Sequence, residues 1–341
     1  MLSPKTRPRS LPRRLVALLI GAALALPAAA APLIAPIPPQ GPAKVRFAAD
    51  FPALTDSTYG FRIGGFGGIS AGAPRRHVPV IFVHGNTVDH TDWYPVRDAF
   101  KAAGWTDQEL WALSYNGLGG NGAMLTVSNP ERDAEHAEMG YDGQTHQTDN
   151  DSNVADLYAF IQAVRTYTGS SQFTLVTHSL GVTLARKTLK VHPELRSELL
   201  AFVGIAGANH GTSLCPPGTE TLIVSCNEIA LGTQWLKDLN GPDGNDETYG
   251  PARWMTIYDN TGVGDPSYLT PLYANSPALK GAANRKFPLT YHNDLRLQPR
   301  IIKLYRQFIE AVETGSPNPA NPGGLLGGPL PQLPALPPLL P

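Results

Sequence analysis

The sequence predicts an α/β fold in which helices cover both faces of a mainly parallel central sheet. Two observations lead to this prediction. Short apolar runs rich in β-branched residues alternate in single file with stretches of helical periodicity, the order that builds parallel sheets. Two of these runs also lead directly to short polar turns, one at His84-Gly85-Asn86 and one at Ser179. In such a sheet, ligands bind at the carboxyl ends of the strands.

Each expected element has its own signal. Short apolar runs predict strands, and apolar residues repeating with helical spacing predict helices. Strands are expected at residues 77–83, 110–115, 173–176, 200–205 and 254–258, and helices at 94–103, 180–189 and 299–312. A further helix has apolar residues of 154–164 on one face, with Asn150 or Ser152 as its N-cap and Gly169 as its terminator.

The charge balance argues against one class of partner. The 341 residues carry 27 Lys and Arg against 28 Asp and Glu, so no basic excess is available to neutralise phosphates. Nucleic acid is therefore not an expected partner. Hydrophobic residues make up 42% of the chain, which supports a sizeable core and excludes disorder throughout.

The first thirty residues have the order of a secretory signal. Arg13-Arg14 precede an apolar run over residues 15–26, and small residues follow it. Such a run falls short of the ~20 residues that span a bilayer, so no transmembrane segment is predicted, and an uncleaved anchor is the alternative. We therefore expect residues 1–30 to be a signal peptide and the protein to be secreted, extracellular or periplasmic.

The rest of the chain divides into three parts. Residues 31–46 form a Pro-rich lead-in, and residues 47–315 hold the alternating pattern and form the domain expected to carry the chemistry. Residues 316–341 are uncharged and rich in Pro, Gly and Leu, which predicts a disordered tail.

Only two cysteines are present, Cys215 and Cys226, close together in the sequence. An exported chain meets an oxidising compartment, so we expect them to form a disulfide, with two free thiols as the alternative. Two cysteines without a nearby His pair do not make a zinc site. No metal and no cofactor are expected.

The segment Val176-Thr-His-Ser-Leu-Gly-Val182 places a serine in a sharp turn between a strand and a helix, the setting of the nucleophile elbow G-x-S-x-G. Gly181 fits this pattern, because it lets the helix pack close to the strand. Thr177 departs from it, since a β-branched residue replaces the usual first glycine. Ser179 is the candidate nucleophile, and an ordinary N-cap serine is the alternative.

Two backbone amides are candidates for an oxyanion hole. The N–H of Leu180 lies at the start of the predicted helix, where the helix dipole favours negative charge. The turn at Gly85 brings the amide of Asn86 to the same cavity, as in the loop after an early strand of α/β-hydrolases. A simple strand-ending turn is the alternative for this second feature.

Chain order then selects the base and the acid. In this architecture the order is Ser, acid, His, and His292 is the histidine that follows a plausible acid strand, just ahead of the last helix. Asp259 and Asp265 both follow the strand at 254–258. Asp265 is the preferred acid because the intervening glycine-containing turn can carry it over the edge of the sheet, and Asp259 is expected to cap that turn.

These residues resemble a known family. The segments Gly64-Gly-Phe-Gly-Gly-Ile-Ser70, Val80-Ile-Phe-Val-His-Gly-Asn86, 163–172 and 176–182 are similar to the secreted class 2 lipases of the α/β-hydrolase fold, including the extracellular polyhydroxybutyrate depolymerases without a polymer-binding domain. The similarity is good over residues 60–210 and looser around Asp265 and His292. Family members usually carry Ala or Gly at the position of Thr177.

The resemblance implies a catalytic triad of Ser179, Asp265 and His292, with the amides of Asn86 and Leu180 as the oxyanion hole. It implies a secreted serine carboxylic-ester hydrolase, a lipase or esterase, whose partner is an apolar or polymeric ester substrate, with no obligate protein partner. A polyhydroxybutyrate depolymerase with the same triad, acyl transfer to an alcohol, and a non-catalytic surface-binding scaffold are the alternatives. The long connections 116–150 and 207–251 are expected to select the substrate.

Overall fold

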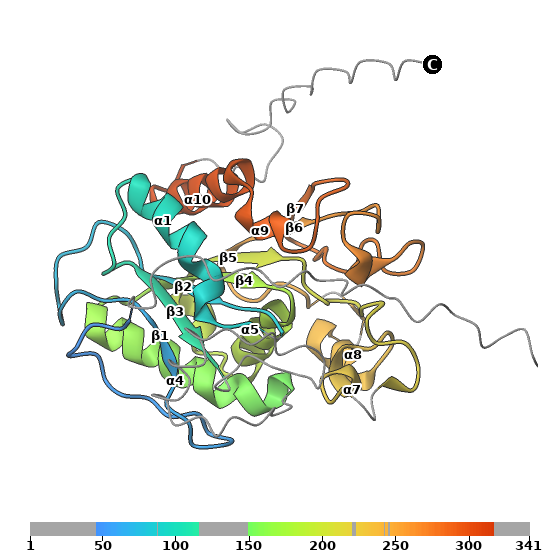
Figure 1. Ribbon diagram of the computed structural model, residues 1–341, viewed down its shortest axis with the longest axis horizontal. Coiled ribbons are helices and arrows are strands. Elements are labelled where there is room, and N and C mark those ends of the chain that lie inside the picture. Colours follow the sequence, from blue (N-terminus) through green and yellow to red (C-terminus); the bar gives the residue numbers. More distant parts are fainter. Residues whose placement is uncertain are drawn as a thin grey trace, which may run out of the picture. The chain divides into compact units, whose positions relative to one another are not determined.

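A seven-stranded sheet, in the order β1-β3-β2-β4-β5-β6-β7, forms the centre of the described part of the chain (Figure 1). The computed structural model describes residues 46–86, 88–115, 149–219, 223–241, 243–244 and 246–316. The expected signal peptide, nearly all of the lead-in, nearly all of the connection 116–150 and all but the first residue of the tail lie outside the described residues. The described residues belong to one unit, Pro36–Pro341.

The sheet is parallel except at one edge, where β1 pairs antiparallel with β3. This arrangement confirms the predicted fold class. The strands are β1 (Gly64–Phe66), β2 (Val80–Val83), β3 (Leu110–Ser114), β4 (Phe173–His178), β5 (Leu199–Ile205), β6 (Arg253–Tyr258) and β7 (Ala283–Lys286).

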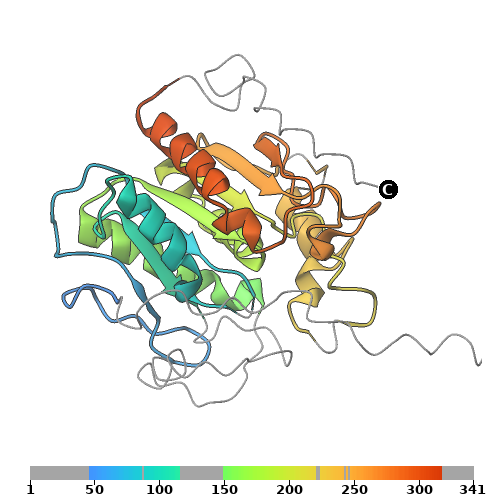
Figure 2. The ribbon, with the colours of Figure 1, turned by 45° about the horizontal axis from the view of Figure 1, so that its top comes forward.

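Helices cover both faces of the sheet (Figures 1 and 2). One face carries α1 (Tyr94–Ala102), α9 (Asp294–Leu297) and α10 (Pro299–Glu313), and the other carries α4 (Asn150–Thr168) and α5 (Leu180–Val191). Alternate residues of a strand point to opposite faces, which explains the two separate cores. In β2, Val80 and Phe82 join the core under α1 and α10, whereas Ile81 and Val83 join the core under α4 and α5.

The start of α4 differs from the prediction. Its N-cap is Asp149, whose side chain accepts a hydrogen bond from the Ser152 N–H at 2.9 Å, so the expected caps Asn150 and Ser152 were wrong. The Asp149 carboxylate thus accepts from one N–H of the first turn, and the N–H groups of Asn150 and Asp151 donate to the carboxylate of Glu228. The helix ends at Gly169 as predicted, with a left-handed φ of 64°.

Several short elements were not predicted. These are β1, β7, α6 (Leu195–Glu198), α7 (Cys226–Ile229), α8 (Gln234–Asn240) and the 3-10 helices η1 (His90–Trp93) and η3 (Pro266–Tyr268). The strand expected at 77–83 is confined to Val80–Val83. Nowhere in the described ranges is a helix long and apolar enough to cross a membrane.

Candidate active site

Ser179 occupies a strained turn between β4 and α5. Its φ of 54° and ψ of −125° lie in a region that non-glycine residues rarely adopt, and such outliers concentrate at functional sites. Its N–H donates to the carbonyl of Ile205 at 2.8 Å, which fixes the turn to β5. Gly181 is required because a Cβ there would lie 2.3 Å from the His84 carbonyl oxygen. The helix therefore approaches β2 closely.

Thr177 replaces the usual first glycine of the nucleophile motif, and its surroundings accommodate the larger side chain. The side chain is fully buried, and its hydroxyl donates a hydrogen bond to the carbonyl oxygen of Val203 at 3.0 Å. The polar atom thus has a partner on β5, so a β-branched residue replaces glycine at β4 without an unsatisfied buried hydroxyl.

The segment His84–Asn86 lies against the nucleophile turn. A Cβ at Gly85 would lie 2.8 Å from the Cβ of Ser179, so only glycine allows this approach. Leu180 is the first residue of α5, where the N–H groups have no partner within the helix. The two amides expected as oxyanion donors, those of Asn86 and Leu180, are thus carried by segments in mutual contact.

Asp265 and His292 share a buried hydrogen bond. Oδ2 of Asp265 lies 2.7 Å from Nδ1 of His292, and both side chains are almost completely inaccessible to solvent. A carboxylate only accepts, so Nδ1 is the donor of this bond, and in the neutral imidazole that arrangement leaves the lone pair on Nε2. The other oxygen of Asp265 accepts from the N–H of Ser267 at 3.0 Å, and this bond orients the carboxylate at the start of η3.

His178 links Ser179 to His292. Its Nε2 donates to the backbone carbonyl of His292 at 3.2 Å, and the two imidazole rings lie with centroids 4.7 Å apart. Burial lowers the pKa of His178 well below its usual value, and the nearby His292 adds to this effect, so His178 is neutral. Between the described side chains of Ser179 and His292 there is no direct hydrogen bond. Sequence reasoning missed His178, because only the tertiary contact marks it.

Asp259 organises the turn that carries Asp265. Its carboxylate accepts hydrogen bonds from the backbone N–H groups of Thr261, Gly264, Asp265 and Leu289, each at 3.0 Å. Burial alone would raise the pKa of Asp259, but these bonds and that of the Thr261 hydroxyl outweigh it and leave the pKa lowered. Asp259 therefore caps the turn, and none of its hydrogen bonds within the described residues goes to His292.

A buried ion pair connects η1 to α9, the helix that follows His292. Arg296 on α9 pairs with Asp92 of η1, with 2.8 Å between Nη2 and Oδ2, and its Nη1 also donates to the Asp92 carbonyl. Burial raises the pKa of Asp92 to about 6 despite the opposing charge of Arg296. The pair joins the segment after the Asn86 turn to the helix after His292. Nothing in the sequence pattern pointed to it, since its members are far apart in the chain.

The other two histidines that follow Ser179 in the sequence, His192 and His210, contact different residues. The ring of His192 stacks on Tyr158 with centroids 3.8 Å apart, and His210 contacts Glu247 through Nε2 at 2.9 Å. Within the described ranges, no group of three or more His, Cys, Asp or Glu side chains is arranged to hold a metal ion.

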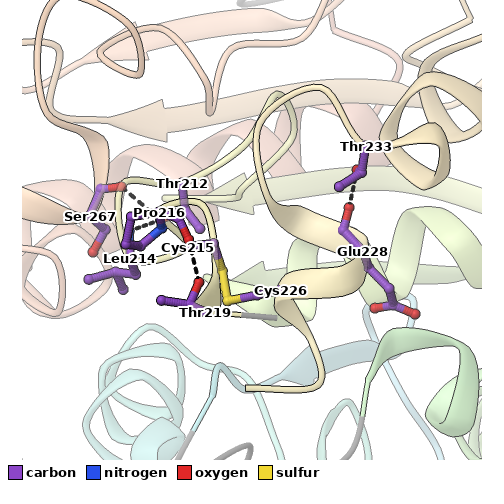
Figure 3. Close-up of a disulfide and its surroundings, with 9 residues drawn as sticks. All are labelled: Thr212, Leu214, Cys215, Pro216, Thr219, Cys226, Glu228, Thr233 and Ser267. Atoms are coloured by element: carbon purple, nitrogen blue, oxygen red, sulfur yellow. Dashed lines mark hydrogen bonds between the residues drawn. A yellow bond between two sulfur atoms is a disulfide. The ribbon is translucent and has the colours of Figure 1, made fainter. Parts of the chain in front are cut away.

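Cys215 and Cys226 form the expected disulfide, with Cα atoms 5.4 Å apart (Figure 3). On one side of it, Thr212 donates to the carbonyl of Ser267 at 2.8 Å, which attaches this segment to the 3-10 turn after Asp265. On the other side, the carboxylate of Glu228 accepts from the N–H of Asn150 at 2.7 Å, at the start of α4. The connection 207–251 is thus hydrogen-bonded both to the 3-10 turn after Asp265 and to the start of α4.

Comparison with known proteins identifies the family. The family profile described as Lipase (class 2) matches residues 77–131 and 135–261, more than half of the chain. The chain belongs to the class 2 lipase family. No curated protein matches the sequence significantly.

Solved structures show the same fold. Lipase B of Aspergillus fumigatus is 18% identical, with a TM-score of 0.50 over 69% of this chain and 52% of that chain. The propeptide form of the lipase BlEst2 of Bacillus licheniformis is 15% identical, with a TM-score of 0.50 over 70% of this chain and 52% of that chain. This chain therefore spans about half the length of each. At these identities the likeness concerns the fold alone.

Proposed function

We propose that this class 2 lipase is a secreted serine carboxylic-ester hydrolase that cleaves apolar esters through an acyl-enzyme on Ser179. The observation that carries the proposal is the buried hydrogen bond between Asp265 and His292, whose ring packs against the residue preceding the strained Ser179 turn. Membership of a lipase family supports a hydrolase that acts on esters.

In the proposed reaction, Asp265 holds the His292 tautomer whose Nε2 accepts the proton of Ser179. The serine Oγ attacks the ester carbonyl, the alcohol leaves with the proton returned by His292, and an acyl ester on Ser179 remains. Water, deprotonated by the same imidazole, then releases the acid and restores the hydroxyl. The bond between Ser179 and His292 forms in the substrate complex, since catalytic hydrogen bonds often tighten only there.

The amides of Asn86 and Leu180 are the proposed donors to the oxyanion. Both belong to segments that contact each other at Gly85 and Ser179, and the Leu180 amide adds the positive end of the α5 dipole. Donors fixed before the reaction need no reorganisation when charge develops on the carbonyl oxygen.

Two substrate types fit the family equally, lipids and hydroxyalkanoate polyesters. The experiment that tests the function compares the wild type with Ser179→Ala on emulsified trioctanoin and on a polyhydroxybutyrate film. Release of fatty acid identifies a lipase, and release of soluble hydroxy acid identifies a polyester depolymerase. If the Ser179→Ala protein hydrolyses either substrate as fast as the wild type, the proposal is wrong.

Acyl transfer uses the same residues and differs only in the molecule that attacks the acyl-enzyme. Product analysis in water with added excess alcohol separates the two outcomes: hydrolysis gives the free acid, and transfer gives a new ester. A scaffold that only binds would give neither product.

Export is the second part of the proposal. It is supported by the order of residues 1–30, by the Cys215–Cys226 disulfide and by the family. N-terminal sequencing of protein recovered from the culture medium or the periplasm tests it. Export predicts an N-terminus at or shortly after residue 30.

A further inference from the structure

The two proposed oxyanion donors are held in different ways. The N–H of Leu180 shares a peptide unit with the carbonyl of Ser179, which accepts a hydrogen bond from the N–H of Val182 at 3.0 Å at the start of α5. The helix thus fixes the direction of this donor. The turn His84–Asn86 follows β2 and lies outside the described helices and strands. Side chains around the turn therefore decide how the Asn86 N–H is directed.

The imidazole of His84 fixes the peptide unit that carries the Asn86 N–H. Its Nδ1 lies 2.8 Å from the carbonyl oxygen of Gly85, and since a carbonyl only accepts, Nδ1 is the donor of this bond. The Gly85 carbonyl and the Asn86 N–H belong to one planar unit, and the bond between them is trans, so the two groups point in opposite directions. A Gly85 carbonyl held by His84 therefore also holds the direction of the Asn86 N–H.

Tyr115 holds the ring of His84. The two rings stack with their centroids 3.9 Å apart and their planes only 3° apart. Tyr115 is 2% exposed and directly follows β3, the strand that pairs with β2 in the sheet (Figure 1). Burial lowers the pKa of His84 to about 4, so the stacked ring is neutral at pH 7. The stack therefore fixes the plane in which the Nδ1–H of His84 points.

The hydroxyl of Tyr115 fixes the preceding peptide unit of the turn. It donates to the carbonyl oxygen of His84 at 2.9 Å and lies 3.5 Å from that of Gly85, at the outer limit of a hydrogen bond. Burial raises the pKa of this hydroxyl, so it stays protonated and remains a donor. The same His84 carbonyl packs against α5, where a Cβ at Gly181 would lie 2.3 Å from its oxygen. Tyr115 thus controls two consecutive peptide units, one directly and one through His84.

The end of β3 also holds the chain on the other side of Asn86. Ser114, the last residue of β3, accepts a hydrogen bond on Oγ from the N–H of His90 at 3.1 Å. The same Oγ lies 2.7 Å from Nδ1 of His90. The segment that contains Asn86 is therefore attached to the end of β3 both before and after this residue.

We propose that Tyr115 is a positioning residue of the oxyanion hole, which holds the turn His84–Asn86 so that the Asn86 N–H is directed in advance at the oxygen on which negative charge develops. This inference rests on the proposed function for the role of the Asn86 N–H. The effect of Tyr115 passes through the two carbonyls of the turn, so its own side chain does not contact the substrate. A donor with a fixed direction stabilises the transition state without reorganisation, and a donor that can rotate stabilises it less.

Two substitutions at Tyr115 test the positioning role. Tyr115→Phe keeps the stacked ring and removes the hydroxyl, and should lower kcat for a soluble p-nitrophenyl ester about tenfold while KM changes less than about twofold. Tyr115→Leu also removes the stack on His84 and should lower kcat on the order of 10²-fold. If the Leu variant does not fold, the Phe variant alone decides. A kcat of Tyr115→Phe equal to that of the wild type would overturn the inference.

A thionoester substrate separates a positioning role from a general loss of structure. Sulfur replaces the carbonyl oxygen in this substrate and accepts hydrogen bonds only weakly, so the thionoester gains less from the oxyanion donors. The ratio of kcat/KM for the ester to that for the thionoester should therefore fall at least about threefold in Tyr115→Phe. A structural defect would lower both rates by the same factor, and an unchanged ratio would overturn the inference.

Tyr305→Phe is the matched control. Tyr305 on α10 is also fully buried, and its hydroxyl donates to the backbone carbonyl of Arg296 at 3.2 Å, so the variant loses the same kind of bond. Its melting temperature should fall by an amount similar to that of Tyr115→Phe, because each loses one buried hydrogen bond. Its ratio of ester to thionoester rates should stay within about twofold of the wild type. Equal changes of this ratio in both variants would contradict the proposed role of Tyr115.

Amide hydrogen exchange of the segment 80–86 follows the turn without catalysis. Exchange in this segment should be at least about fivefold faster in Tyr115→Phe than in the wild type, and unchanged in Tyr305→Phe. Equal exchange in Tyr115→Phe and the wild type would overturn the inference. If the wild type hydrolysed no ester, the proposed function would fail, and this measurement would still decide whether Tyr115 holds the turn.

Discussion

Asp259 accepts a hydrogen bond on its Oδ2 atom from the backbone N–H of Asp265, at 3.0 Å. The two carboxylates, which are six residues apart in the chain, therefore have different partners. Asp259 binds backbone N–H groups of the turn, and Asp265 binds the imidazole of His292. Their substitutions should consequently have different effects.

Asp265→Asn should lower kcat by roughly 10⁴-fold with little change in melting temperature, because the amide favours the wrong tautomer of His292. The measurement is steady-state hydrolysis of a soluble p-nitrophenyl ester, with thermal unfolding as the control. Activity near that of the wild type would exclude Asp265 as the acid.

Asp259→Asn should act chiefly on stability. Each carboxylate oxygen accepts backbone N–H groups, and the new amide would face two of these donors and leave them unsatisfied. The expected loss is about 1–3 kcal/mol of unfolding free energy for each unsatisfied donor, measured by urea denaturation. A variant with unchanged stability and abolished activity would reverse the roles of the two aspartates.

His178 is expected to position His292 through its hydrogen bond to the backbone carbonyl. His178→Phe keeps a ring but removes the donor, and should lower kcat on the order of 10²-fold while KM changes little. His178→Gln retains an N–H donor and should recover most of the rate. If the Gln and Phe variants are equally slow, the hydrogen bond is not the cause.

The buried strands and their turns could be predicted from the sequence. β2 and β4 are runs of β-branched and apolar residues buried along their whole length, so composition alone marks them. The hydrogen bond between Asp265 and His292 joins a histidine that chain order had selected to an aspartate that the glycine-containing turn had favoured over Asp259. Both could be selected because the order of strands fixes which loops meet at the carboxyl edge. The catalytic roles of these residues remain part of the proposal.

Other features depend on contacts that no local pattern reveals. The edge strands β1 (Gly-Gly-Phe) and β7 (Ala-Asn-Arg-Lys) lack apolar periodicity and form because a neighbouring strand offers hydrogen bonds. The helices α7 and α8 are too short to show a helical period within the connection 207–251. The Asp92–Arg296 pair joins positions more than two hundred residues apart, and only folding brings them together.

Removal of the disulfide should destabilise the protein. Cys215 and Cys226 are separated by 11 positions, and closing a loop of this size restricts the unfolded chain enough to contribute about 3 kcal/mol. The double variant Cys215→Ser with Cys226→Ser should lose roughly this amount in urea denaturation under oxidising conditions. Dithiothreitol should lower the stability of the wild type to that of the variant and leave the variant unaffected. A wild type that is insensitive to the reductant would contradict this prediction.

Acid should destabilise the fold partly through His84. Burial lowers its pKa to about 4, so the unfolded chain binds more protons than the folded chain between about pH 6.5 and pH 4. The contribution of His84 to the unfolding free energy is therefore complete above pH 6.5. It is lost as the pH falls to about 4, which lowers the unfolding free energy by an amount on the order of 3 kcal/mol.

The variant His84→Phe keeps a ring against Tyr115, on which His84 stacks with centroids 3.9 Å apart, and removes the titration. The unfolding free energy of this variant should decline less steeply between pH 6.5 and pH 4, with His178 still contributing in the same direction. Identical slopes for the wild type and His84→Phe would show that His84 does not titrate in this window.

The central claim is that Ser179 is a nucleophile activated by His292 and Asp265. The most direct measurement is the intact mass after treatment with a fluorophosphonate, in which Ser179 Oγ displaces fluoride from phosphorus and its proton leaves as HF. We predict the addition of one phosphonyl group to the wild type, at least 10²-fold slower labelling of Asp265→Asn, and no labelling of Ser179→Ala. An unlabelled wild type, or a label retained at full rate in Ser179→Ala, would contradict the claim.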